Sequence, residues 1–445
     1  MKQRATEKTI WIALALLSPA LPLQLYFGGN WYALLHSYSL GMVFGILSYT
    51  YFLNALIIAS RIRYFDRVFG HDRILVFHGY LAFTAFVFAQ FHFAFKRTYV
   101  SSPTIQSALG VGGLAIFTLI VVVTGLFMID SFLHKIPVVR AVKHFAVKRL
   151  GFDYSRLKFF HNFTAAASVL IAIHVFLAYS TQENLERKAV MMAWATIAVA
   201  LYIHHKFLRG ILGRGKKFSL AKISTPAEGI VQLELNAVSG PLRGHKAGQF
   251  AYFKFLSSVC GRAEHPFTIS SPPKADALTI TVKNLGDYTA RLRHVPIGTR
   301  VVVDGPYGVF TPVQDGNPHL FVAGGIGVTP FLSILHEWKK RGITHSTTLV
   351  WSVKAKNDLI HADELSALQR SAAAFRFVPV ITREDAGEIA SRIDRTLLEK
   401  VIIPTVRKTI RVYVCGPDSL RRGVVAIVQQ LGVPRARIHF ERFSF

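Results

Sequence analysis

The chain has 445 residues, of which 51% are hydrophobic and only 17% are charged. This composition excludes a single soluble domain, and the length leaves room for a membrane part followed by two soluble domains. The net charge of +27 does not indicate a nucleic-acid-binding protein, because much of the surplus lies beside apolar segments and the sequence has no nucleic-acid-binding motif.

The apolar segments are concentrated before residue 212, and each is close to the ~20 residues that cross a bilayer. The first also resembles a signal peptide, because Ser18-Pro19-Ala20 is a weak cleavage site. Lys and Arg residues crowd 61–73, 135–158 and the stretch after the last segment, which predicts that these loops face the cytoplasm. We predict six transmembrane helices in domain 1–212, at 9–27, 38–59, 74–95, 111–133, 157–179 and 189–208.

Two histidine pairs lie inside these segments. His78 and His92 are 14 residues apart in the third segment, and His161 and His174 are 13 residues apart in the fifth. On a helix either spacing is about 20 Å, most of the depth of a bilayer. Imidazoles in hydrocarbon need a partner or a function, and two of them can bind one haem iron from opposite sides. We therefore predict two haems, one at His78 and His161 near the cytoplasmic face and one at His92 and His174 near the other.

The spacing in the fifth segment conflicts with a regular helix. At about 100° per residue, His161 and His174 lie about 140° apart around the helix axis. The helix must kink, twist or contain a π-bulge if both side chains bind haem. Two alternatives need no haem: a proton pathway through the histidines, or helices that only anchor a reductase.

After residue 213 the pattern changes to short strands separated by Gly and Pro turns, which predicts a β-barrel over 213–313. The run His265-Pro266-Phe267-Thr268-Ile269-Ser270-Ser271 has a backbone fixed by proline and hydroxyls available to a flavin and its ribityl chain. Further on, Lys283 precedes Gly286-Asp287-Tyr288-Thr289 at the start of a predicted helix, where a cation, free amides and a hydroxyl suit a diphosphate. The expected strands are 229–238, 249–255, 266–270, 278–283 and 300–304.

Strands and helices alternate in the last domain, 314–445, which predicts a Rossmann-like parallel sheet. The first strand leads into Gly324-Gly325-Ile326-Gly327-Val328-Thr329-Pro330, where glycines let the backbone approach a pyrophosphate and Pro330 suits a first helical turn. Two cations, Lys354 and Arg383, follow the second and third strands, and no acidic residue ends the second strand to hold a free ribose diol. The expected strands are 319–323, 347–353, 375–381 and 410–415.

The motifs HPFTISS, GDYT and GGIGVTP, after membrane helices with paired histidines, resemble the NADPH oxidase and ferric reductase family, especially its compact bacterial members. The resemblance implies a ferredoxin-reductase-like module with FAD on HPFT and GDYT, and two b-type haems on the four histidines. It implies that Cys415-Gly416-Pro417 lines the nicotinamide, and that Lys354 and Arg383 lie where a 2′-phosphate can bind, which favours NADPH over NADH. It also implies that a near-terminal aromatic covers the flavin, for which Phe443 is the first choice and Phe445 the second.

The expected activity is electron transfer from cytosolic NADPH through FAD and two haems to an acceptor across the bilayer. Molecular oxygen, giving superoxide, is the first choice of acceptor. A ferric chelate is the alternative, because Lys96 and Arg97 at the outer end of the third segment can attract an anion. We expect a bacterial inner-membrane location with no obligatory protein partner, and no calcium control, since the sequence has no EF-hand loop.

Overall fold

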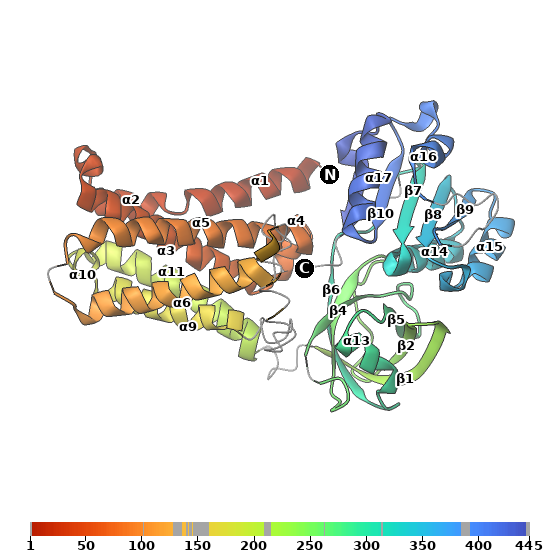
Figure 1. The fold of residues 1–445 in the computed structure, drawn as a ribbon, viewed down its shortest axis with the longest axis horizontal. Coiled ribbons are helices and arrows are strands. Elements are labelled where there is room, and N and C mark those ends of the chain that lie inside the picture. Colours follow the sequence, from red (N-terminus) through yellow and green to blue (C-terminus); the bar gives the residue numbers. More distant parts are fainter. Residues whose placement is uncertain are drawn as a thin grey trace. The chain divides into compact units, whose positions relative to one another are not determined.

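The computed structural model describes residues 2–100, 102–127, 136–138, 141, 145, 160–208, 215–261, 263–312, 315–383 and 392–441. The chain forms two compact units, Met1–Leu212 and Gly213–Ser444, and each is described by itself (Figure 1). Phe443 and Phe445 lie outside the described residues, as do the end of the predicted fourth span and the start of the fifth.

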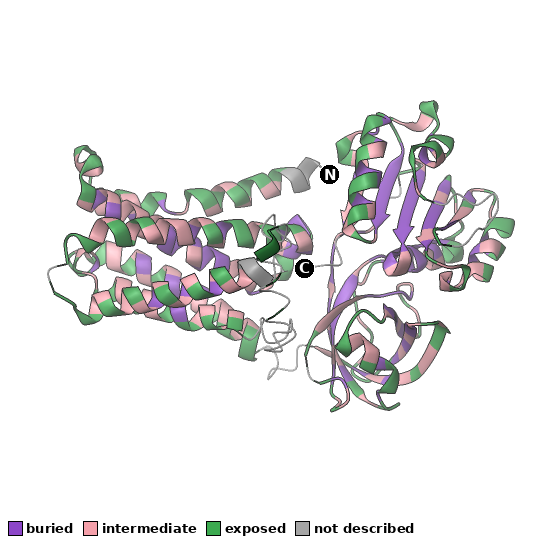
Figure 2. Cartoon of the chain, in the orientation of Figure 1, coloured by how far each residue is buried: buried purple, intermediate pink, exposed green. Residues whose placement is uncertain are grey.

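Helices build the first unit. Small buried residues such as Ala85, Ala167 and Ala198 lie between them, whereas large apolar side chains such as Leu14 and Leu119 are exposed, as a lipid-facing surface requires (Figure 2). The elements are α1 (Lys2–Leu17), α2 (Ala20–Phe27), η1 (Trp31–Leu35), α3 (Ser37–Ala59), α4 (Arg63–Phe69), α5 (His71–Arg97), α6 (Ile105–Phe127), α9 (Phe163–Leu177), α10 (Tyr179–Gln182), α11 (Leu185–Ile203) and the π-helical turn η3 (His204–Leu208).

Five stretches of the described chain are long and apolar enough to cross a membrane: Thr6–Phe27, Ser37–Ala59, His71–Arg97, Ile105–Thr124 and Leu185–Leu208. The sixth predicted span, 157–179, corresponds to α9, which has only 15 described residues. The fourth span begins earlier than predicted because Thr104 and Ser107 form a reciprocal cap. Ser107 N–H donates to Thr104 Oγ1 at 3.1 Å, and Thr104 N–H donates to Ser107 Oγ at 2.8 Å.

The predicted β-barrel is confirmed in the second unit. Its strands are β1 (Lys216–Ala227), β2 (Ile230–Ala237), β3 (Phe250–Phe255), β4 (His265–Thr268), β5 (Ala277–Lys283) and β6 (Arg300–Tyr307), in the order β4-β3-β6-β1-β2-β5. The barrel closes between its outer strands through a bridge from Ile269 to Ile280 and a 2.8 Å bond from Ser270 N–H to the Thr279 carbonyl. Two short helical segments follow β5, α13 (Asp287–Arg291) and η4 (Leu292–His294).

A parallel sheet completes this unit. Its strands are β7 (His319–Gly324), β8 (Thr347–Val353), β9 (Phe375–Ile381), β10 (Arg411–Cys415) and β11 (Ile438–Glu441), in the order β11-β10-β7-β8-β9. The strands are almost wholly buried (Figure 2). Helices α14 (Thr329–Arg341) and α15 (Ala362–Ser371) pack on one face, and α16 (Arg395–Val401) and α17 (Asp418–Gln430) on the other. The short segments are η5 (Gly325–Val328), η6 (Lys356–Asp358), η7 (Pro404–Val406) and η8 (Arg435–Arg437).

Two strands of this unit were not predicted. β1 follows the basic stretch and is exposed along much of its length, so its sequence lacks a clean apolar alternation. β11 has only four residues and lies close to the end of the chain. Each is held by pairing with neighbours distant in sequence, β1 with β6 and β11 with β10, which a local pattern does not reveal.

Candidate functional site

The structure brings the predicted histidine pairs together. The ring centres of His78 and His161 (the 78–161 pair) are 6.4 Å apart, and those of His92 and His174 (the 92–174 pair) are 6.2 Å apart. Two imidazoles on opposite sides of one metal ion, each with a metal–nitrogen bond of ~2.0–2.1 Å, have ring centres roughly 6.3 Å apart. Both pairs therefore fit one six-coordinate iron each.

Three of the four imidazoles are oriented by a backbone carbonyl. Nδ1 of His78 lies 3.0 Å from the Ala55 carbonyl oxygen. Nδ1 of His92 lies 2.7 Å from that of Gly41, and Nδ1 of His174 lies 2.8 Å from that of Gln106. A carbonyl only accepts, so Nδ1 carries the proton and Nε2 keeps a free lone pair for a metal. For His161 Nδ1, the described residues provide no partner.

The predicted distortion of the fifth helix lies next to His161. Residues 160 and 161 are helical, Asn162 is a turn, and α9 begins only at Phe163. The Asn162 carbonyl accepts from Ala165 N–H at 3.1 Å, an i to i+3 bond that tightens the first turn. Asn162 Oδ1 also accepts from Lys206 Nζ at 2.8 Å, and Lys206 lies in the π-helical turn η3. The segment is therefore irregular directly after His161, where the 13-residue spacing predicts a distortion.

A cavity of about 870 Å³ opens beside the 92–174 pair. Both imidazoles line it, and its wall includes the cations Lys96, Arg97 and Arg187. The ammonium of Lys96 lies 3.1 Å from the ring centre of Tyr38, another wall residue. The cavity therefore combines two metal-ligand side chains with positive charge, which suits a flat apolar cofactor with anionic substituents.

The flavin motif lies on β4 and the chain that follows it. His265 stacks on Tyr288 with ring centres 3.6 Å apart, so β4 is joined to the start of α13. Ser270 Oγ donates to the Thr279 carbonyl at 3.1 Å, and Ser271 Oγ accepts from Thr279 N–H at 3.0 Å. Ser270 thus uses its hydroxyl proton inside the barrel, whereas Ser271 Oγ only accepts and keeps its proton for another acceptor. The buried Thr268 Oγ1 has no partner among the described residues, so Thr268 and Ser271 both keep a hydroxyl donor for a ligand.

The second flavin motif forms a tight loop. Thr289 Oγ1 accepts from Gly286 N–H at 3.1 Å and donates to the Gly286 carbonyl at 2.9 Å. Lys283 is the last residue of β5, shortly before this loop. Tyr288 was not among the predicted site residues, although it lies inside the GDYT motif. Its burial raises the pKa of its phenol, so it stays neutral.

The glycine motifs of the last domain meet where the strand order reverses, between β7 and β10. A Cβ on Gly327 would lie 2.4 Å from the Cys415 carbonyl oxygen, and one on Gly416 would lie 2.9 Å from Gly324 N. Only glycine allows this close packing. Ligands of open α/β sheets bind at such a reversal, outside the carboxyl ends of the strands. The backbone at Gly325 is held in place by the neighbouring strand β8, because the Gly325 carbonyl accepts from Trp351 Nε1 at 2.9 Å.

The two cations predicted for a 2′-phosphate are brought together. Arg383 N–H donates to the Lys354 carbonyl at 3.1 Å, and both residues are exposed at the carboxyl end of the sheet. Pro330 occupies the first turn of α14, and Thr329 Oγ1 donates to the Ile326 carbonyl at 3.1 Å. Cys415 is wholly buried. That burial, helped by Glu441, raises the pKa of its thiol well above the usual value, so it is not a thiolate nucleophile at neutral pH.

Comparison with known proteins matches both domains of the second unit. Residues 215–311 match a family described as "FAD-binding domain", and residues 321–426 match "Oxidoreductase NAD-binding domain". The reductase component of propane 2-monooxygenase from Mycolicibacterium goodii is 24% identical over 261 residues, 56% of this chain and 73% of that protein. The structure of the FAD/NAD-binding domain of nitric oxide dioxygenase from Vibrio cholerae matches with 22% identity and a TM-score of 0.46, over 51% of this chain and 98% of that structure.

Two haem-related or oxidase relatives also match. Respiratory burst oxidase homolog protein A of Arabidopsis thaliana is 28% identical over 206 residues, 40% of this chain and 22% of that protein. Flavohemoprotein A of Dictyostelium discoideum is 32% identical over 152 residues, 34% of this chain and 37% of that protein. The chain thus spans less than half of either protein.

The domain matches and the sheet topology define the class of the protein, which is a NAD(P)H-dependent flavin oxidoreductase. More particularly, the chain joins an FAD-binding and a NAD-binding domain to a unit whose described residues include five apolar helices long enough to cross a membrane, as in a multi-pass membrane protein.

Proposed function

We propose that the chain belongs to the NADPH oxidase and ferric reductase family and transfers electrons from cytosolic NADPH across a membrane, with molecular oxygen as acceptor and superoxide as product. FAD takes a hydride and releases single electrons, and two b-type haems carry these across the bilayer. The observation that carries the proposal is the spacing of 6.4 Å and 6.2 Å in two histidine pairs that share a chain with an FAD and a NAD-binding domain.

Different residues of the second unit bind the two dinucleotides. His265, Thr268 and the Gly286 to Thr289 loop hold the flavin dinucleotide. Gly324, Gly327 and the Cys415-Gly416-Pro417 segment leave room for the nicotinamide dinucleotide at the strand reversal, while Lys354 and Arg383 bind the 2′-phosphate that distinguishes NADPH. In this proposal Cys415 lines the nicotinamide through its backbone, since its thiol is buried and protonated. Phe443 remains our choice for the aromatic that covers the flavin.

The charge of the loops orients the first unit. The 78–161 pair lies toward the basic, cytoplasmic side and holds the haem that receives electrons first. The 92–174 pair holds the haem near the opposite face. A haem held by both imidazoles of this pair would pass electrons to the acceptor without binding it on the iron.

A ferric chelate is the second candidate acceptor. It is favoured by the cavity of about 870 Å³ beside the 92–174 pair, whose wall carries Lys96, Arg97 and Arg187. Anionic chelates are attracted by such a cluster, whereas neutral oxygen gains nothing from it. The same cations also suit haem propionates. They therefore do not distinguish the two acceptors, which the following experiment does.

The experiment is an absorbance spectrum of the purified full chain during NADPH addition, followed by oxygen uptake with and without superoxide dismutase in sealed vesicles. We expect reduced b-type bands, two haems per chain and superoxide. His92→Leu should remove one haem and stop reduction of an acceptor outside the vesicle, while the exposed control His36→Gln keeps both haems. A chain without a Soret band would refute the proposal. If the haems are reduced and an iron chelate is reduced, but no oxygen is taken up, the acceptor is the ferric chelate, the second candidate.

A further inference from the structure

Both ligands of the 92–174 pair are held in the same way, by two different helices. His92 on α5 bonds to the carbonyl of Gly41 on α3, and His174 on α9 bonds to the carbonyl of Gln106 on α6. In each case a glycine follows the accepting residue by four positions, Gly45 on α3 and Gly110 on α6. The same arrangement therefore occurs twice, on two helices of different sequence.

The missing side chains of these glycines leave the space that the imidazoles occupy. A Cβ on Gly45 would lie 2.7 Å from His92 Nδ1 and 2.9 Å from its Cε1. A Cβ on Gly110 would lie 2.7 Å from His174 Nδ1 and 2.8 Å from its Cε1. These separations are far inside van der Waals contact, so a Cβ at either position would displace the imidazole from the place it now occupies.

The four-residue spacing has a geometric cause. In a helix the carbonyl of one residue accepts from the N–H four positions later, and its second lone pair is free for another donor. Each Cα–Cβ bond points toward the helix N-terminus, so the Cβ of that later residue covers the approach to this second lone pair. A glycine at this position leaves the second lone pair of the carbonyl open to a donor.

The 78–161 pair supplies an internal comparison. His78 Nδ1 bonds to the Ala55 carbonyl at 3.0 Å, longer than the 2.7 Å and 2.8 Å of the 92–174 pair. The residue four positions after Ala55 is Ala59, which has a Cβ. Among the three histidine–carbonyl bonds of the described residues, the two shorter ones are thus those in which a glycine stands four positions after the accepting residue.

We propose that Gly45 and Gly110 are positioning residues that seat the imidazoles of His92 and His174 on their carbonyls and so aim each Nε2 at one metal. This inference rests on the proposed haem site at the 92–174 pair. It assigns both glycines a role at the ligands, beyond the close helix packing for which glycines are common in membrane helices.

The first test uses Gly45→Ala and Gly110→Ala in the purified full chain. We expect each to shift or remove the low-spin electron paramagnetic resonance signal of one haem and to leave the other unchanged. The matched controls are Gly79→Ala and Gly112→Ala, because a Cβ there meets nothing within 4 Å. Unchanged signals in both test variants, or equal changes in the controls, would overturn the proposal.

A packing control separates ligand seating from helix contact. A Cβ on Gly113 meets the Ile171 side chain at 2.7 Å and no imidazole. Gly113→Ala should therefore leave both haem signals in place. If it disturbs the same haem as Gly45→Ala and Gly110→Ala, helix packing explains the glycines and the proposal is wrong.

The second test needs no haem. Gly45→Ala should lower the thermal midpoint of the haem-depleted protein but not that of the same protein carrying His92→Ala, because the imidazole is then absent. Alanine is otherwise the better helix former, so without the imidazole the substitution should be neutral or stabilising. An equal loss in both backgrounds would overturn the proposal. If the wild type binds no haem, the proposed function fails, while this cycle still decides whether the glycines seat the imidazoles.

Discussion

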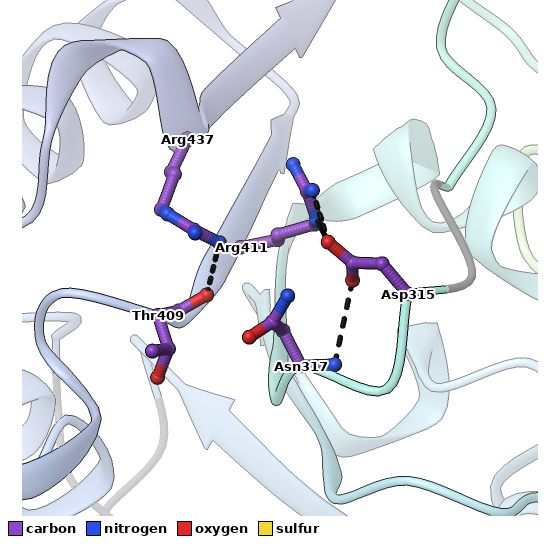
Figure 3. Close-up of polar contacts among 5 residues, drawn as sticks. All are labelled: Asp315, Asn317, Thr409, Arg411 and Arg437. Carbon is purple, nitrogen blue, oxygen red and sulfur yellow. Dashed lines mark hydrogen bonds and ion pairs between the residues drawn. The ribbon is translucent and has the colours of Figure 1, made fainter.

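The buried pair Arg411–Asp315 provides a quantitative test of how the NAD(P)-binding domain is held. Figure 3 shows the Arg411 guanidinium facing the Asp315 carboxylate, with Nε to Oδ2 at 2.9 Å and a second, shorter bond from Nη2. Asp315 also accepts from Asn317 N–H at 3.3 Å. The pair joins the chain before β7 to the first residue of β10, and the far ends of these strands carry the nucleotide loops.

The magnitude follows from burial. The Arg411 side chain is 5% exposed and that of Asp315 is 26% exposed. Removing one partner of a fully buried pair costs about 3–5 kcal/mol, whereas exposed pairs contribute about 0–1 kcal/mol. Because water reaches Asp315, we expect Asp315→Asn to destabilise this unit by roughly 2 kcal/mol, a fall of about 4–8 °C in Tm for a domain of this size.

The pH dependence has a defined sign. Arg411 holds the pKa of the Asp315 carboxyl well below its usual range, so the pair contributes fully above the unfolded value of about 3.9 and loses its contribution as the pH falls below that value. The difference between wild type and Asp315→Asn should therefore be largest near neutral pH and shrink below about pH 4.

The assay is thermal melting of the full chain, followed by the fluorescence of released FAD, at pH 7 and at about pH 3, below the unfolded pKa. The control is Glu399→Gln on α16, where Arg395 Nε lies 2.8 Å from Glu399 Oε1 in a pair that is about half exposed, and where we expect at most about 0.5 kcal/mol. Equal shifts in the two variants, or an effect of Asp315→Asn that is as large at the lower pH as at pH 7, would refute this reasoning.

Three further outcomes are expected. Cys260 and Cys415 should resist maleimide at pH 7 and react after unfolding, as peptide mass spectrometry can show, because burial raises the pKa of both thiols. Lys354→Ala should raise KM for NADPH about tenfold and leave that for NADH unchanged, since one charge-assisted bond is lost. Lys206→Met should lower the potential of the haem at the 78–161 pair by roughly 30–60 mV in a redox titration, because a cation bonded to Asn162 beside His161 disfavours the oxidised haem.

Periodicity and motifs predicted much of the fold. The 13-residue spacing of His161 and His174 required an irregular helix, and the interruption lies at Asn162. The start of α6 was misplaced because the cap formed by Thr104 and Ser107 extends the helix beyond its most apolar stretch. Caps of this kind are visible in the sequence once both residues are considered together.

The sites that depend on register were harder to predict. Ser270 and Ser271 are predicted flavin contacts, and closure of the barrel also places Thr279 beside them, a contact that the local sequence does not reveal. Likewise, Gly45 and Gly110 are ordinary glycines in an apolar helix until the neighbouring helix places an imidazole against each. These glycine–imidazole contacts of the helical unit join residues more than 40 positions apart, so a single sequence carries no local signal for them.

The histidine pairs also bear on how the membrane unit is held together. Two helix pairs pack closely in this unit, α3 with α5 and α6 with α9, and α11 packs on both α3 and α9. Each histidine pair takes one residue from α5, and its mate is His174 on α9 or His161 just before α9 begins. The carbonyls that orient the 92–174 pair come from α3 and α6. A haem bound between the imidazoles would therefore contact both helix pairs and strengthen the link that α11 makes. Since a ligand that binds only the folded state adds its binding free energy to stability, haem should contribute to holding this bundle together as well as to electron transfer.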